Sequence, residues 1–277
     1  MKRFALAGLL AFCTIVELYA WDLIQAKGGR TNSLGRCSVA LSDFWSLHNN
    51  SAGAASCKDL KFGISYENRF LLKELNVKDA GLLIPLNYGT IGISISQFGY
   101  EHYNENAIGL GISRSFGEKI KIGLNLYYLL LRFSDSYSNK SAPTFDIGFQ
   151  YKLNESLCLG AYFFNPINVK INTINKDKIP VIIRFGISYL VVDNFMFCCE
   201  IEENLDDNFS FRFGFEYEIF KNVYIRSGFQ FKPEFFTFGI GYNYEWFTVD
   251  VAAQMNQDLG ATLTCSMIFN ITKRKIT

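Results

Sequence analysis

The residues best suited to acid–base chemistry are His48 and His102, the only histidines in a chain of 277 residues. His102 stands next to Glu101 and close to Glu105, and a histidine among carboxylates can act as a general base. A lipid-hydrolysing site on a β-sheet wall would need a histidine and a serine on strand positions. His48 falls instead in a segment without strand pattern, and His102 falls in a predicted loop. The sequence therefore predicts no catalytic residues and no enzyme.

Seven cysteines are the other reactive groups. Cys37 and Cys57 flank one N-terminal segment and could close a disulfide in an oxidising compartment. The other cysteines beyond the first twenty residues are Cys158, Cys198, Cys199 and Cys265. They fall within predicted strands, where a cysteine most often serves as a small buried hydrophobe. Neither a CxxC pair nor a histidine cluster is present, so the sequence predicts no metal site and no cofactor.

Charged residues recur at one phase of the strands predicted in the second half of the chain. They are Arg184, Glu200, Glu202, Arg212, Glu216, Glu218, Arg226 and Asp250. Mixed charges in a narrow interior most often satisfy one another, whereas a selective ion channel would show one sign in excess at its constriction. We therefore expect a lumen charge network that holds the wall, or a plug, together.

The elements that position these charges are predicted from strict period-two alternation between Asp59 and Ile271. The clearest stretch is 209–219. It places Phe209, Phe211, Phe213, Phe215, Tyr217 and Ile219 on one face and Ser210, Arg212, Gly214, Glu216 and Glu218 on the other. A helix would scatter these groups around its circumference, so the pattern predicts strands with one apolar and one polar face.

Fourteen such segments can be counted along the chain. They begin near Leu60, Ala80, Thr90, Ile108, Ile120, Thr144, Leu157, Val181, Phe195, Phe209, Val223, Phe236, Phe247 and Ala261. Every second connection is a tight turn, as at Gly117-Glu118, while the connections 98–106, 133–143 and 165–180 are longer. An even strand number, short periplasmic turns and longer external loops are typical of outer-membrane barrels.

The 27 phenylalanines and 15 tyrosines decide between two all-β architectures. A soluble β-sandwich also alternates, but fourteen aromatic-rich faces would make an unusually large shared core. Closing the sheet in a bilayer satisfies every backbone group and turns the apolar faces to lipid. The predicted fold class is therefore a transmembrane antiparallel β-barrel of about fourteen strands, integral to a bacterial outer membrane and in contact with its lipid.

Residues 1–20 predict a signal peptide, because two basic residues precede an apolar run that ends in Leu-Tyr-Ala. An uncleaved anchor is the alternative, although the run is shorter than the ~20 residues that a spanning helix needs. Cleavage would remove two basic residues and one acidic residue, and so balance the 27 basic and 26 acidic residues. Nucleic acid is not an expected partner, because phosphate binding needs a basic excess.

Residues 28–55 do not alternate and read GGRTNSLGRCSVALSDFWSLHNNSAGAA. This stretch resembles the N-terminal signature of PorV/PorQ and FadL-like outer-membrane barrels, in which Gly-Arg leads through Leu-Gly and Val-Ala-Leu-x-Asp to Asn-Pro-Ala-Gly. The matching residues are Gly29, Arg30, Leu34, Gly35, Val39, Ala40, Leu41, Asp43, Asn50, Ala52 and Gly53. Ser51 stands where the family prefers proline.

The resemblance implies that residues 21–58 fold into the barrel on its periplasmic side as a plug, followed by the barrel (59–271) and a basic tail (272–277). Glycines at the inward phase of most predicted strands would let another backbone approach the wall. They are Gly63, Gly81, Gly92, Gly109, Gly111, Gly123, Gly148, Gly160, Gly186, Gly214, Gly228, Gly239 and Gly241. Relief of curvature in the wall explains the same glycines equally well.

For function, the resemblance implies a non-enzymatic accessory of type IX protein secretion, with secretion-system proteins as partners. One alternative is a FadL-like transporter of hydrophobic small molecules, and another is a structural subunit of a different outer-membrane complex. A bulge that interrupts one strand would favour the transporter. The changes of phase at Gln97-Phe98 and Cys198-Cys199 are candidates for such a bulge.

Overall fold

A closed barrel of fourteen antiparallel strands dominates the computed structural model, which describes residues 22–134, 139–171, 179–205 and 209–272. The strands are β1 (Leu60–Asn68), β2 (Asn76–Leu86), β3 (Gly89–Gly99), β4 (Tyr103–Phe116), β5 (Ile120–Phe133), β6 (Lys140–Lys152), β7 (Leu157–Phe164), β8 (Ile182–Val192), β9 (Phe195–Asn204), β10 (Ser210–Phe220), β11 (Val223–Phe231), β12 (Phe235–Asn243), β13 (Phe247–Asn256) and β14 (Gly260–Thr272). Each strand pairs with its sequence neighbours, and β14 pairs with β1. The predicted fold class and strand number are confirmed; the predicted signal peptide and residues 273–277 of the tail lie outside the described residues.

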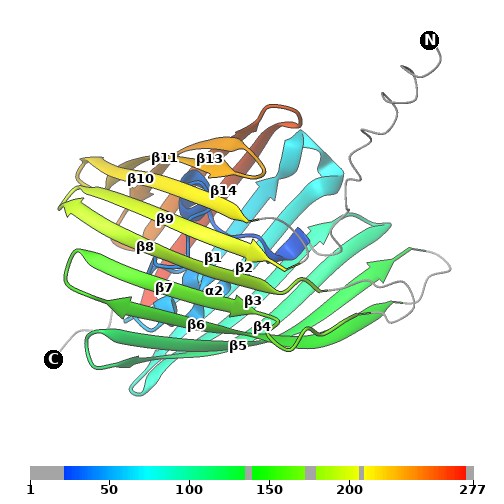
Figure 1. Ribbon diagram of the computed structural model, residues 1–277, viewed down its shortest axis with the longest axis horizontal. Helices are drawn as coiled ribbons and strands as arrows, with labels where there is room; N and C mark the ends of the chain where they lie inside the picture. The colour runs from blue at the N-terminus through cyan, green and yellow to red at the C-terminus, as the bar shows by residue number, and fades with distance from the viewer. Residues whose placement is uncertain (1–21, 135–138, 172–178, 206–208, 273–277) are drawn as a thin grey trace, which may run out of the picture.

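The two ends of the barrel carry different connections (Figure 1). The predicted tight turns, such as 117–119 between β4 and β5, gather with the C-terminal end of the chain at the left of Figure 1, which we call the turn end. The opposite end, the loop end, carries the connection 165–181 between β7 and β8. Because short turns face the periplasm in outer-membrane barrels, the loop end faces the exterior.

Two external connections are shorter than the sequence predicts. β3 runs to Gly99 and β4 begins at Tyr103, so the predicted loop 98–106 shrinks to residues 100–102. Likewise β6 begins at Lys140, before the predicted start near Thr144. These strands continue past the stretches that alternate clearly, because a ladder can extend beyond the bilayer where polar side chains are tolerated on both faces.

Alternation sorts the side chains of β10 as predicted. Phe211 and Phe213 expose 43% and 41% of their surface, whereas Arg212 and Glu216 between and beyond them expose 4% and 8%. An apolar residue that is exposed on the outside of a closed barrel faces lipid. The phenylalanines are therefore the outer face of the strand, and the charges line its lumen.

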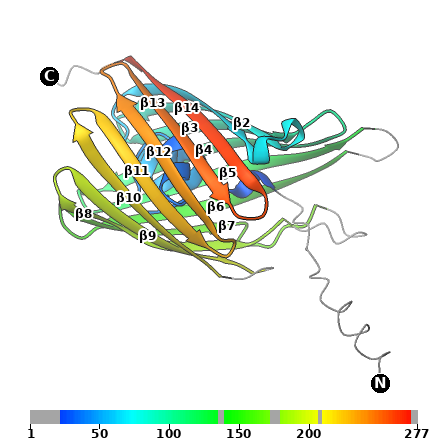
Figure 2. The ribbon, with the colours of Figure 1, turned by 90° about the horizontal axis from the view of Figure 1, so that it is seen from above.

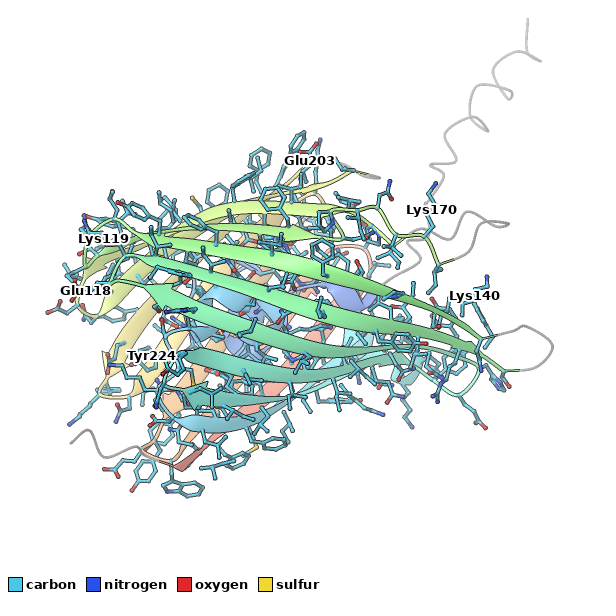
Figure 3. The ribbon with its side chains drawn as sticks, turned by 90° about the horizontal axis from the view of Figure 1, so that it is seen from below. Glu118, Lys119, Lys140, Lys170, Glu203 and Tyr224 are labelled. Carbon is cyan, nitrogen blue, oxygen red and sulfur yellow. The ribbon has the colours of Figure 1, made fainter. Side chains whose placement is uncertain are left out.

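The same sorting produces an apolar band around the barrel. In Figure 3 the charged residues Glu118 and Lys119 lie at one end of the wall, and Lys140 and Lys170 lie at the other. Trp246, at the turn end, packs against its neighbours in a cluster of aromatic rings typical of a membrane interface. An apolar band between two polar ends is the surface of a membrane-embedded barrel, and the chain is an integral outer-membrane protein.

Residues 22–58 lie inside the barrel, as the blue ribbon between the walls in Figure 2 shows, and we call them the lumen segment. They form η1 (Asp22–Ile24), α1 (Gly29–Ser33), α2 (Ser46–Asn49) and α3 (Ser51–Ala54). None of the helices in the described ranges is long and apolar enough to cross a bilayer. α1 contacts β11 to β14, and α3 contacts β3 to β6, so the segment bridges opposite parts of the wall.

The wall approaches the lumen segment closely where glycine faces it. A Cβ added at Gly160 would lie 2.3 Å from the carbonyl oxygen of Val39, and one at Gly228 would lie 2.1 Å from the backbone nitrogen of Gly35. At Gly111 the added Cβ would instead meet a side chain of the wall itself. Close backbone approach therefore explains some of the inward glycines, and crowding within the wall explains others.

Substitution of Gly228 by alanine tests this packing. The added methyl has no room against the backbone of Gly35, so we expect the seated lumen segment to lose about 1–3 kcal/mol of stability. A loss of one to two kcal/mol raises the unseated fraction of the segment about 5–30-fold. Tryptic cleavage after Arg30 or Arg36 should therefore accelerate about 5-fold or more. Gly92→Ala is the matched control, since its nearest neighbour lies 3.4 Å away. Equal cleavage rates for the two variants would contradict the packing described above.

Candidate functional site

Asn50 joins the lumen segment to the wall. Its Nδ2 donates to the carbonyl oxygen of Val39 at 2.6 Å and lies 3.3 Å and 3.2 Å from the carbonyl oxygens of Phe149 and Ala161. Its Oδ1 accepts from the backbone nitrogen of Ala52 at 3.2 Å, which caps α3. The Asn50 side chain thus bonds both to the start of α3 and to the backbone of β6 and β7.

Ser51, which replaces the proline of the motif, is the first residue of α3. Proline favours that position because it lacks the amide hydrogen that a helix start leaves unpaired. The serine instead directs its hydroxyl toward Asp146, at 3.4 Å from Oδ1. Oδ2 of the same carboxylate accepts bonds from Asn125, Tyr127 and Tyr162 at 3.1, 2.8 and 3.2 Å. Asp146 therefore organises the wall beneath α3.

The remaining small or apolar motif residues are buried in the lumen segment. They are Gly29, Leu34, Gly35, Val39, Ala40, Leu41, Ala52 and Gly53. The backbone nitrogen of Gly29 donates to Ser266 Oγ, and that of Gly35 donates to Thr237 Oγ1, both at 2.9 Å. Gly35 has a φ of 63°, a conformation that favours glycine. These residues let wall hydroxyl groups satisfy the backbone of the segment.

Arg30 anchors the segment electrostatically. Its Nε and Nη2 donate to the Glu216 carboxylate at 2.8 and 2.7 Å, and its Nη1 lies 3.1 Å from Asp43 Oδ2. Glu216 also pairs with Arg226 at 2.5 Å, and Arg226 pairs with Asp250 at 2.7 Å. One chain of ion pairs therefore runs from the lumen segment across β10, β11 and β13.

A second group of ion pairs lies on β8, β9 and β10. Arg212 contacts Glu200 at 2.8 Å and Glu202 at 2.6 Å, and Arg184 pairs with Glu202. Glu200 Oε2 also accepts the backbone amides of residues 38–39 at 2.7 and 2.8 Å. A carboxylate of the wall thus accepts hydrogen bonds from two amides of the segment that would otherwise be buried without acceptors.

The structure brings most of the predicted lumen charges together, but Glu218 does not join these groups. Its carboxylate accepts the backbone amide of Asn222 at the turn end, at 2.8 Å, because β10 reaches the membrane boundary there. Sequence reasoning also left out a group in which Glu67 contacts Arg69 and Asn32 at 2.7 and 2.6 Å. Alternation assigns residues to the inward face, but it cannot say which of them a second segment will meet.

The predicted disulfide between Cys37 and Cys57 is absent, and both residues are free thiols. Cys37 is buried against Cys198 of β9, and burial raises the pKa of its thiol well above the usual value. Cys57 lies just before β1, where its sulfur is 3.1 Å from the carbonyl oxygen of Asp59. The prediction failed because the segment crosses the lumen between the two cysteines.

The two histidines occupy separate environments. His48 lies in α2, where burial lowers the pKa of its imidazole to about 4 and keeps it neutral near pH 7. The His102 ring packs on Tyr100 in the short connection between β3 and β4. Glu105 points into the lumen instead and accepts the amide of Leu23 at 3.2 Å, so it does not join His102 in the arrangement suggested by the sequence. Within the described ranges, no three potential ligands cluster to hold a metal ion.

Toward the loop end, the inward face is apolar on β2 to β8, whereas Glu67 of β1 and the ion pairs of Arg184, Glu202 and Arg212 keep the other side polar. Buried apolar side chains from β2 to β8, the lumen segment and the connection 165–181 pack together on the apolar side, and we call them the lumen apolar cluster. Its members are Leu23, Val39, Val77, Phe98, Leu129, Leu131, Ala142, Tyr162, Phe164, Ile171, Ile179 and Ile182. Asn165 holds the connection in place by donating to the carbonyl oxygen of Ile179 at 2.9 Å. One side of the external half of the lumen therefore has a hydrophobic lining.

This lining explains the change of phase that suggested a bulge at Gln97 and Phe98. The pairing of β3 is unbroken there on both sides, and Phe98 simply points inward into the lumen apolar cluster. The pairing of β9 is likewise unbroken at Cys198 and Cys199. A further sequence signal for the cluster was the run Leu-Tyr-Tyr-Leu-Leu-Leu at 126–131, because a strand that is apolar on both faces is buried on both.

η1 covers the lumen apolar cluster. Leu23 belongs to the cluster, and Ile24 packs against it. Glu105 accepts the amide of Leu23, and Arg184 Nη2 donates to the carbonyl oxygen of Ile24 at 3.1 Å. The N-terminal end of the described chain therefore occupies the hydrophobic part of the lumen.

Comparisons with known proteins agree with this architecture. The TodX monoaromatic hydrocarbon channel deltaS2 mutant superposes with a TM-score of 0.72 at 10% identity over 91% of this chain and 100% of that chain. The CymD monoaromatic hydrocarbon channel gives 0.65 at 12% identity over 91% and 99%, and a Pseudomonas aeruginosa FadL homologue gives 0.63 at 11% identity over 87% and 98%. No protein-family model matches the chain, and no curated protein matches it in sequence.

The fold, the apolar outer face and the filled lumen define the class of this protein as a fourteen-strand barrel of an outer membrane. Within that class it shares its fold with the TodX and CymD channels and with the FadL homologue. The candidate functional site is the lumen, where ion pairs hold the segment and an apolar cluster lines β2 to β8 at the loop end.

Glu216→Gln tests the anchoring of the segment. Loss of the charge weakens the bonds to both Arg30 and Arg226, and bonds to charged groups contribute about 1.5–3 kcal/mol, so we expect a destabilisation of about 1–3 kcal/mol. The measurement is the urea midpoint of the purified protein in micelles, followed by tryptophan fluorescence. Glu218→Gln is the matched control on the same face of β10 and should shift the midpoint far less. The assignment of Glu216 as the anchor would fail if the control lowered the midpoint as much.

Proposed function

We propose that the barrel passes hydrophobic small molecules across an outer membrane, with the lumen segment as its plug. The lumen apolar cluster carries the proposal, because a barrel that served only as a scaffold or an aqueous pore would need no apolar inward face on β2 to β8 at its external mouth. Transfer of apolar surface from water to such a lining is favourable by about 25 cal/mol per Å². The cluster therefore offers a hydrophobic solute its first binding surface at the loop end.

The position of η1 supports the same proposal. Leu23 and Ile24 place aliphatic side chains on the cluster that a hydrophobic solute would contact. A solute that binds there must displace η1, whose backbone is held by Glu105 and Arg184. Since η1 continues into the rest of the lumen segment, its displacement loosens the plug at the point where the solute arrives.

The superposed channels support the substrate class without defining it. Two of them are described as monoaromatic hydrocarbon channels. The present chain shares their architecture, although only 10% and 12% of the aligned residues are identical. The type IX secretion role expected from the motif at 29–53 gains no support from these neighbours, and secretion-system partners stay a prediction. A purely structural role in another outer-membrane complex would not require an apolar lining of the lumen.

Leu131 provides the test, because it is buried in the lumen apolar cluster and exposes 3% of its surface. We expect Leu131→Asn to lower uptake of a radiolabelled monoaromatic hydrocarbon roughly tenfold or more, since an unpaired amide in an apolar site costs about 1–3 kcal/mol. Uptake is measured in a bacterial host that lacks its own hydrophobic channels, and the gel shift of the folded barrel shows that the variant is assembled.

Leu131→Met is the control, because it keeps the volume and the apolar character of the site. It should retain uptake near that of the unaltered protein. Uptake by the unaltered protein no greater than that of an empty host would contradict the proposed function, and so would equal uptake by the asparagine and methionine variants.

A further inference from the structure

Two cysteines from distant parts of the chain meet where the lumen segment touches the wall. Cys37 follows α1, and Cys198 lies on the inward face of β9; they expose 1% and 2% of their surface. Cys37 Sγ lies 3.8 Å from the carbonyl oxygen of Cys198, and both side chains belong to one buried cluster. Leu34, Leu41 and Met196 surround the pair. The two sulfurs therefore share one buried, apolar site.

The backbone around the pair is fixed by a carboxylate rather than by side-chain packing alone. Glu200 follows Cys198 on the same face of β9 and accepts the amides of Ser38 and Val39 at 2.7 and 2.8 Å. Residues 37–39 therefore run alongside residues 198–200. The contact between the cysteines is a consequence of where the segment is seated.

The neighbouring cysteines are placed differently. Cys199 lies on the opposite face of β9 and is directed toward lipid, because side chains alternate along a strand. Cys57 contacts Asp59 at the start of the wall. Neither of them shares the site between the segment and β9 that holds Cys37 and Cys198.

We propose that Cys37 and Cys198 form a disulfide under oxidising conditions, and that this bond fixes the lumen segment to β9 and holds the barrel closed. The bond itself rests on the contact between the two buried cysteines, while its closing role rests on the proposed function. A plug that must move for a solute to pass cannot leave its seat while it is covalently joined to the wall.

The reaction is a thiol–disulfide exchange with a small-molecule disulfide or a thiol oxidoreductase of the periplasm as oxidant. One cysteine thiolate attacks a sulfur of the oxidant, and the first thiol of the oxidant leaves with a proton. The second cysteine then attacks the protein sulfur of this mixed disulfide and releases the second thiol. The two cysteines lose two electrons and two protons, and the oxidant disulfide gains both.

Burial determines when this exchange takes place. In the seated segment the Cys37 thiol is shielded, and its raised pKa keeps it protonated, so it is a poor nucleophile. Displacement of the segment exposes both cysteines to the solvent in the lumen. Oxidation then follows an opening of the plug, and reseating completes the bond.

Mass spectrometry of tryptic peptides tests the bond directly. The peptide 37–58 contains Cys57 as well as Cys37, and the peptide 185–212 contains Cys199 as well as Cys198. A Cys57→Ala, Cys199→Ala double variant removes this ambiguity and leaves the proposed pair in place. After incubation of the folded protein with oxidised glutathione, we expect a linked pair of these two peptides that separates on reduction.

Single substitutions provide the controls. Adding Cys37→Ala or Cys198→Ala to the double variant should abolish the linked pair, whereas adding Cys158→Ala should leave it unchanged. The proposal is overturned if oxidation leaves Cys37 and Cys198 free to react with an alkylating agent in denaturant, or if Cys37 is linked to another cysteine.

The closing role has its own measurement. Hydrocarbon uptake by the oxidised double variant should fall severalfold below that of the reduced one, and Cys198→Ala should make uptake independent of oxidation. Measurable uptake that is equal in both redox states of a linked protein would overturn the closing role. Absence of uptake in either state would count against the proposed function, while the linked peptides would still decide whether the bond forms.

Discussion

The interior of the barrel has to be filled by something other than its own wall, and this constraint governs the rest of the structure. Most strands carry a glycine at an inward position, so the wall alone leaves space. The lumen segment occupies that space with backbone as well as side chains. Every amide that enters a lumen without bulk water needs an acceptor, and the wall supplies acceptors such as Glu200, Thr237 and Ser266.

Two sides of the lumen have different contacts with the segment. On β8 to β13, carboxylates and guanidinium groups tie the segment to several strands at once, through Arg30 nearer the turn end and Glu200 nearer the loop end. On β2 to β8, the lining at the loop end is apolar and is covered by η1. A segment that is anchored at one end and rests on a hydrophobic surface at the other is suited to loosen first where a hydrophobic solute would bind.

Much of the wall could be predicted from the sequence, because membrane barrels impose a strict period of two. The stretch 209–219 alternates without interruption, and β10 exposes its phenylalanines as expected. The lumen could be predicted less well, because its contacts join residues that are distant in the sequence. Cys37 meets Cys198 rather than Cys57, and Arg30 meets Glu216. Alternation failed at Phe98 because we expected a polar interior, whereas this side chain points into an apolar part of the lumen.

The central claim is that the segment 29–54 is folded inside the barrel and bonded to its wall. Amide hydrogen exchange of the purified protein in micelles tests it most directly, because exchange reports the free energy of local opening. We expect the amides of Ser38 and Val39, which bond to Glu200, to exchange as slowly as those of neighbouring strands. Exchange of residues 29–54 at the rate of an unfolded chain, in a barrel whose strands remain protected, would contradict it.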